Sequence, residues 1–311
     1  MIWVEPFAGS LAVGLSLVGA TPFVGWKGSK ARYAAAIRTI LGVQRADEIW
    51  CADVSSWAAV WRALARPGVA RAAADIVLEI ERDALGRGDC PASYHAVWHE
   101  LREEWRSRPM AVDARAVAVW VCLVKLSGLN AGPEAAGCKE KPAGAWRRHP
   151  RDGSQQARRF DVAVSNPSQR AVSVSTRLRA LPDPLPVRVW SDAREIPPRR
   201  GAVVLLDPPY VGTSGYQGAR GAGQELAALT AGVRDAWLAR GCVVACCEST
   251  AGSGVVYDLT RGERLGGALS ARNHAGRPSQ TAELLTVYHP AGAPTLLDWT
   301  CGERARMRVL R

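Results

Sequence analysis

The chain has 311 residues, 48% of them hydrophobic, which predicts a globular protein with room for one large domain or a core with a smaller module. Its 40 Lys and Arg outnumber 29 Asp and Glu, and the net charge of +11 favours a polyanionic partner, although an Arg-rich coding bias explains part of the excess. The eight Cys residues lack paired metal-ligand spacing, so the sequence argues against zinc sites and disulfide frameworks and for a reducing cytoplasm. An uncharged stretch at 6–26 is interrupted by prolines and glycines, which argues against a membrane span.

Short apolar runs, each ending at a polar or acidic turn, predict the parallel strands of an α/β sheet. In chain order they are residues 1–4, 48–51, 187–190, 203–206 and 242–246. Ligands of such sheets bind beyond the carboxyl ends of the strands. The turns that follow these runs are therefore expected to face one cleft.

The segments between the strands divide the chain into a core and an insert. A glycine turn and a short helix are expected within 6–26, and another helix at 31–41. Helical spacing at 55–129 predicts a helical insert, and the Gly, Pro, Ser and Arg content of 131–186 indicates loops or small hairpins. We therefore predict a catalytic core formed by 1–56 and 186–311 and interrupted by an insert at 57–185. Residues 131–200 hold 14 basic and 7 acidic side chains, which favours a contact with the polyanion there.

The strongest chemical signal is Asp207-Pro208-Pro209-Tyr210, directly after the apolar run 203–206. The carboxylate of Asp207 and the carbonyl of Pro208 can accept both hydrogens of a planar exocyclic amine and favour its nucleophilic form. Proline fixes φ and keeps the preceding residue extended, so the acceptors hold their direction. Tyr210 can stack on a base that has left its helix. The competing interpretation is a Pro-Pro turn with a capping Asp.

Two weaker signals lie near the N-terminus. The segment Glu5 to Ser10 follows the first strand, and Gly9 permits the sharp turn and close backbone approach that a nucleotide-like ligand needs; Leu11 stands where a second glycine is expected. The segment Gly25 to Lys30 precedes a predicted helix, and Lys30 can reach a carboxylate or phosphate. A packing turn and an ordinary capped helix are the alternatives.

Together these segments resemble the Dam-type DNA adenine methylase family, whose catalytic motif is DPPY. Residues 5–10 are similar to its cofactor loop and 26–30 to its WxGGK segment, although that segment precedes the loop in the family and follows it here. The resemblance implies catalytic roles for Asp207, Pro208, Pro209 and Tyr210. It assigns the ribose of S-adenosyl-L-methionine to Asp53 and the cofactor's adenine amine to Asp192. The full set of implied cofactor contacts is Glu5, Pro6, Phe7, Gly9, Trp26, Lys30, Asp53 and Asp192.

The resemblance also implies a Rossmann-like class I methyltransferase sheet, a mainly helical target-recognition insert, and adenine N6 of flipped-out bases in double-stranded DNA as the substrate. No metal is expected. The expected location is the cytoplasm of a prokaryotic or phage-infected cell, and the sequence does not decide whether a companion restriction endonuclease exists. Residues 282–286 resemble a strand of the family's terminal hairpin. DNA contacts are expected from Asn130, Arg147, Arg148, Arg272 and Arg277.

Other interpretations stay open at this level. RNA adenine and DNA cytosine N4 present the same kind of amine to the same acceptors. A catalytically silent DNA-binding relative would keep the fold without the reaction. A nicotinamide oxidoreductase is disfavoured because the chain lacks GxGxxG.

Overall fold

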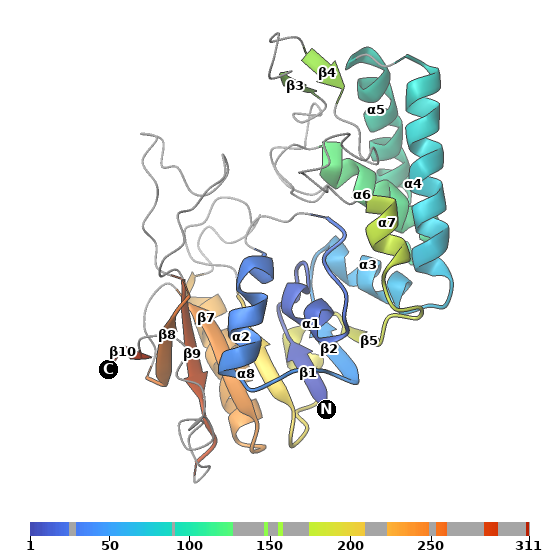
Figure 1. The fold of residues 1–311 in the computed structure, drawn as a ribbon. Coiled ribbons are helices and arrows are strands. Elements are labelled where there is room, and N and C mark those ends of the chain that lie inside the picture. Colours follow the sequence, from blue (N-terminus) through green and yellow to red (C-terminus); the bar gives the residue numbers. More distant parts are fainter. Residues whose placement is uncertain are drawn as a thin grey trace.

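The computed structural model describes residues 1–24, 29–88, 91–126, 146–148, 155–157, 174–208, 223–248, 253–259, 283–291 and 309–310. These residues form an α/β fold around an eight-stranded, mostly parallel sheet in the order β10-β8-β9-β7-β6-β1-β2-β5 (Figure 1). The α/β class predicted from the sequence is confirmed, and the sheet is compatible with a Rossmann-like fold.

All five predicted strands are present and run parallel to one another. They are β1 (Ile2–Glu5), β2 (Glu48–Ala52), β5 (Val187–Trp190), β6 (Val203–Leu206) and β7 (Val243–Glu248). Register places Val4 beside both Trp50 and Val204, so β1 lies between β2 and β6.

Three further strands extend the sheet beyond β7. The strand β9 (Leu284–Tyr288) lies antiparallel between β7 and β8 (Val255–Asp258), and the two-residue β10 (Val309–Leu310) pairs antiparallel with β8. The strand expected at 282–286 corresponds to β9, whereas no apolar run predicted β8 or β10.

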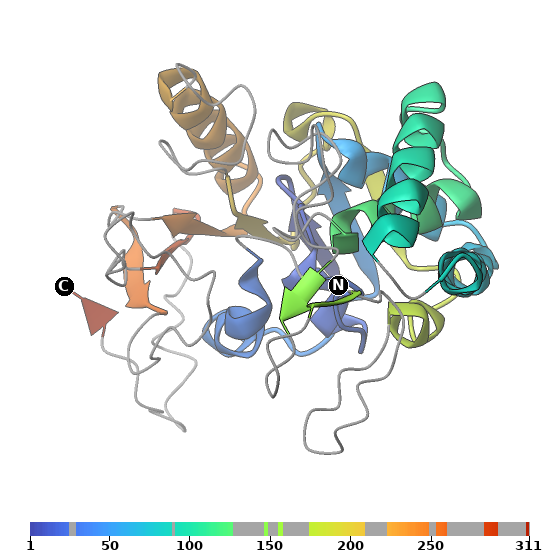
Figure 2. The ribbon, with the colours of Figure 1, turned by 90° about the horizontal axis from the view of Figure 1, so that it is seen from above.

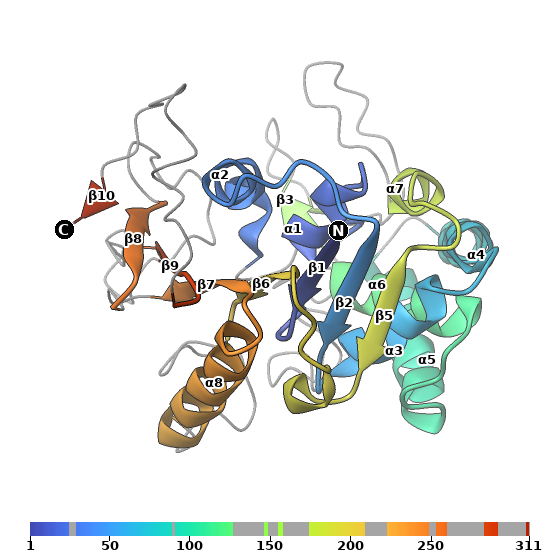
Figure 3. The same cartoon turned by 90° about the horizontal axis from the view of Figure 1, so that it is seen from below.

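Both faces of the sheet are buried, which explains why the strands read as continuous apolar runs. Side chains alternate between the faces, so that Trp3 and Leu205 join one apolar cluster while Val4 and Leu206 join another. The helices α1 (Ala12–Leu17) and α2 (Ala34–Ile40) cover the first face, and α8 (Gly223–Leu238) covers the second, with Trp237 in its cluster (Figures 2 and 3). The predicted helix at 31–41 begins as a 3-10 turn, η1 (Lys30–Tyr33), which leads into α2.

A block of helices lies between β2 and β5 in the chain, as the helical spacing predicted, and stands beyond the β5 side of the sheet (Figure 1). Helix α6 is buried from Ala116 to Val124 and packs against α3, α4 and α5, which makes it the centre of the block. A short antiparallel hairpin, β3 (Trp146–Arg148) with β4 (Gln155–Ala157), belongs to the same insert. The helices are α3 (Ser56–Leu64), α4 (Val69–Gly86), α5 (Pro91–Ser107), α6 (Ala114–Leu126) and α7 (Val174–Arg179).

The described residues contain neither a membrane-spanning helix nor a cluster of metal ligands. No helix there combines the length and the apolar character that a membrane crossing requires. Within the same residues, no group of three or more His, Cys, Asp or Glu side chains is arranged to hold a metal ion.

Candidate active site at the carboxyl edge of the sheet

Four neighbouring strands end beside one another, and an acidic residue follows or ends each of them. The order β6-β1-β2-β5 is parallel throughout, so Asp207, Glu5, Asp53 and Asp192 all lie at the carboxyl edge of the sheet. The sequence-based expectation that these turns face the same edge is confirmed.

The turn after β1 has two residues with left-handed backbone. Gly9 has φ +44°, and Leu11 has φ +51° and ψ +33° with a fully buried side chain. Leucine therefore occupies the left-handed conformation for which glycine is preferred, and burial of its side chain offsets a strain of roughly 1–2 kcal/mol. The turn keeps the backbone shape of a glycine loop although the second glycine is missing.

Asp53 and Trp61 hold Gly9 from two sides. The Gly9 amide donates to Oδ2 of Asp53 at 2.8 Å, and the Gly9 carbonyl accepts from Nε1 of Trp61 at 3.0 Å. The other Asp53 oxygen, Oδ1, accepts from the amide and hydroxyl of Ser55 at 2.8 and 2.5 Å. Asp53 is partly exposed, and each carboxylate oxygen has two lone pairs, so capacity remains to accept from ligand hydroxyls.

Glu5 acts inside the protein, because its side chain is only 5% exposed. Its Oε1 accepts from Nε1 of Trp3 at 2.7 Å and from the amide of Gly14 at 2.6 Å, which fixes α1 against β1. Burial raises the pKa of Glu5 from 4.5 to about 7, against the lowering effect of these two hydrogen bonds. Glu5 therefore shapes the loop, and it contributes a proton-binding group beneath the site.

Asp192 follows β5 and caps the short helix η3 (Ala193–Glu195). Its Oδ1 accepts from the amide and Nε of Arg194 at 2.8 and 2.9 Å, and its Oδ2 accepts from Nη2 of Arg194 at 2.6 Å. These hydrogen bonds lower the pKa of Asp192 and keep it ionised. With 26% of its side chain exposed, Asp192 can accept a further donor at the end of β5.

The catalytic carboxylate predicted at Asp207 is paired with Lys30. The Lys30 Nζ lies 2.7 Å from Oδ1 of Asp207 and 3.3 Å from Oε1 of Glu283, and only 6% of the lysine side chain is exposed. Burial raises the pKa of Asp207, and the Lys30 ammonium opposes that rise. Ser29, the residue before Lys30, joins this segment to the turn after β1, because its hydroxyl oxygen accepts from the hydroxyl of Ser10 at 2.8 Å.

The remaining predicted residues are placed as follows. Pro6 is buried, Phe7 is half-buried against the apolar cluster under α8, and Pro208 is partly exposed beside Asp207. Arg147 and Arg148 lie in β3, where they pair with Gln156 and Gln155. Outside the described residues lie Trp26, Asn130, Pro209, Tyr210, Arg272 and Arg277.

Two contributors to the site were not predicted from the sequence. Trp61 is buried in α3, and its indole Nε1 also donates to the Gly9 carbonyl. Glu283 was noted only as part of a strand, and its contact with Lys30 joins distant parts of the chain. An acidic residue directly before an apolar run was the one available signal for Glu283.

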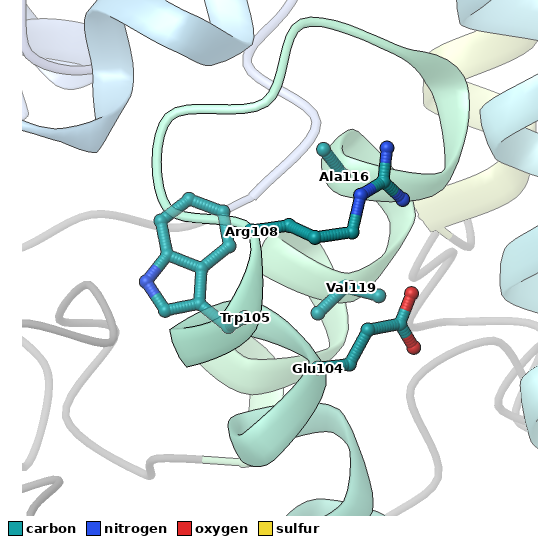
Figure 4. A pocket seen from close by; sticks show the side chains of 5 residues that line it. All are labelled: Glu104, Trp105, Arg108, Ala116 and Val119. Atoms are coloured by element: carbon teal, nitrogen blue, oxygen red, sulfur yellow. The ribbon is translucent and has the colours of Figure 1, made fainter.

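A separate hollow in the helical block is too small for a ligand. Glu104, Trp105, Arg108, Ala116 and Val119 line it between α5 and α6 (Figure 4). Its free volume of about 10 Å³ corresponds to one water molecule. The carboxyl edge of the sheet is therefore the better candidate for a binding site.

No protein-family model matches the chain, and no curated protein matches it. The chemistry of the edge must therefore be argued from its own residues: ionised acceptors, a buried cation beside one of them, and a rigid left-handed turn.

Proposed function

We propose that the protein is an S-adenosylmethionine-dependent DNA methyltransferase that methylates N6 of adenine in double-stranded DNA by base flipping. One observation carries this proposal: Asp207, at the end of β6, is held by the buried Lys30 and adjoins the Gly9–Asp53 turn of the neighbouring strands. The reversed strand β9 distinguishes this sheet from an all-parallel dinucleotide-binding sheet.

The charges at the edge suit a cofactor with a positive centre. The described side chains there are mainly carboxylates. Of the basic side chains, Lys30 pairs with Asp207, and Arg194 pairs with Asp192. A dinucleotide would bring a pyrophosphate into this acidic edge, which is unfavourable, whereas a sulfonium is attracted to it. Gly9 would meet the cofactor with backbone alone, Asp53 would accept its ribose hydroxyls, and Asp192 would accept its adenine amine.

The residues of the chain supply acceptors and alignment for the reaction. When bound, the cofactor provides an electrophilic methyl group on a positively charged sulfur. Asp207 and the Pro208 carbonyl would accept the two N6 hydrogens, and Tyr210 would stack on the extruded base. An amine that accepts this methyl group would release one proton, and the Asp207 carboxylate could receive it. The Lys30 ammonium favours the ionised form of Asp207, against burial, which raises the pKa of this carboxyl.

Incubation with tritiated cofactor and duplex DNA, followed by nucleoside analysis, tests the proposal. We expect label in N6-methyladenine, and a rate at least about 100-fold lower for Asp207→Asn. Asp235→Asn is the matched control, because Asp235 lies exposed on α8 and pairs with its neighbour Arg234; its rate should equal that of the wild type. Label in N4-methylcytosine or in no nucleoside would overturn the assignment, and so would label that appears only when RNA replaces the duplex DNA.

A further inference from the structure

The topology of the sheet brings Glu283 to the edge that carries Asp207. Strand β9 runs antiparallel to β7 and pairs Leu284 with Glu248, the last residue of β7. Because β7 is parallel to β6, the residue before β9 lies next to the carboxyl end of β6. The reversal of a single strand thus places a second carboxylate beside Asp207.

One ammonium contacts both carboxylates. The Lys30 Nζ lies 2.7 Å from Asp207 and 3.3 Å from Glu283, and the two carboxylate side chains are 24% and 19% exposed. An ammonium has three donors, so it can serve both at once. A buried charge without a counter-charge is strongly destabilising, which makes this shared arrangement more than a surface contact.

We infer that Glu283 is a positioning residue for the methyl transfer proposed above: it anchors Lys30, so that Asp207 keeps one oxygen available to the substrate amine. Lys30 contacts Asp207 through Oδ1, and the proposal assigns Oδ2 to the substrate amine. An acceptor whose charge is fully used by a lysine binds an amine hydrogen weakly. Glu283 takes up part of the lysine's charge and donor capacity, and this leaves Asp207 accessible to the substrate amine.

The arrangement has a distinctive consequence for double substitution. With Lys30 present, Glu283→Gln concentrates the ammonium on Asp207 and should lower kcat about tenfold, the change that roughly 1.4 kcal/mol of lost transition-state stabilisation produces. With Lys30→Met, Glu283 and Asp207 face each other without a cation. Removing the Glu283 charge in that background relieves repulsion, so it should leave kcat unchanged or raise it.

The experiment measures kcat and KM for duplex DNA and cofactor in the wild type, Glu283→Gln, Lys30→Met and the double variant. We expect Glu283→Gln to change kcat with each KM within about twofold. Glu283→Asp, whose shorter side chain keeps the charge, should restore part of the rate. Glu48→Gln is the matched control, because Glu48 begins β2 at the opposite end of the strands. The inference would be overturned if Glu283→Gln lowered kcat by the same factor in the wild type and in Lys30→Met. It would also be overturned if Glu283→Gln left the kcat of the wild type unchanged.

A second measurement does not depend on activity. Among the described residues, the groups that influence or are influenced by the Asp207 charge include Lys30, Glu283, Glu5 and the buried thiol of Cys247. With ¹³C-labelled aspartate and neither cofactor nor DNA, the pKa of Asp207 should fall in Glu283→Gln and rise in Lys30→Met. An unmoved pKa in a folded Glu283→Gln protein overturns the inference even where the wild type methylates adenine. A wild type that methylates nothing, but shows both shifts, overturns the proposed function alone.

Discussion

Replacing Glu5 by Gln should change how stability depends on pH. The folded protein raises the pKa of Glu5 from 4.5 to about 7, chiefly because the carboxyl is buried. Between these values the folded state holds a proton that the unfolded state has released, so stability is lost as pH rises and is level above about 7. At 1.36 kcal/mol per pH unit the rise is worth about 3 kcal/mol. Gln keeps an oxygen for Trp3 and Gly14 and does not titrate.

The assay is urea unfolding of both proteins from pH 4.5 to pH 8. The difference in free energy of unfolding should move in favour of Glu5→Gln by about 3 kcal/mol across this range, since titrations shared by both proteins cancel. Glu48→Gln should give the opposite sign, and below about pH 4.5, because the hydrogen bond from Nε1 of Trp50 lowers the pKa of Glu48, so the wild type loses that stabilisation as the pH falls further. A difference between Glu5→Gln and wild type that is constant with pH would refute the reasoning.

Two further predictions concern the turn after β1. Leu11→Gly should be about 1 kcal/mol more stable than Leu11→Ala, because the backbone φ of residue 11 is +51°. Leu15 is equally buried but lies inside the helix α1, so Leu15→Gly should be about 1 kcal/mol less stable than Leu15→Ala. If urea unfolding gave the same order of stability for the Gly and Ala variants at both positions, the left-handed backbone conformation at Leu11 would be contradicted. Trp61→Phe should weaken cofactor binding about fivefold in calorimetry, because the Gly9 carbonyl loses its donor, whereas Trp98→Phe in α5 should not. Equal affinities would exclude the anchoring role of Trp61.

The strands could be predicted because each one is a local pattern. Sheet faces covered on both sides produce apolar runs such as 203–206, and a polar turn marks each carboxyl end. The position of β9 could not be predicted, because the order and direction of strands depend on pairing between distant segments. The sequence also did not predict that the helix expected at 31–41 begins with the 3-10 turn η1, because a 3-10 turn and an α-helical turn have similar sequence patterns.

The site divides in the same way. Asp207, Gly9 and Asp53 were predicted because each follows a predicted strand, and parallel pairing then makes them neighbours. The shape of the turn at Leu11 could not be read from the residue type, since leucine ordinarily avoids left-handed backbone. Glu283 was missed because its role requires the reversal of β9, which no local pattern encodes.

The unusual chain order of the lysine segment does not count against the proposed function. An ion pair requires that Lys30 and Asp207 meet in space, and it is indifferent to whether the lysine precedes β1 or follows α1. Here η1 and α2 pack against α1 on one face of the sheet, and the Ser10–Ser29 hydrogen bond joins the segment to the turn after β1. A lysine segment that packs on this face of the sheet can reach the end of β6 whether it precedes β1 or follows α1 in the chain, because rearranged connections can conserve packing. The catalytic test therefore belongs to the Lys30–Asp207 contact itself and not to the order of the motifs.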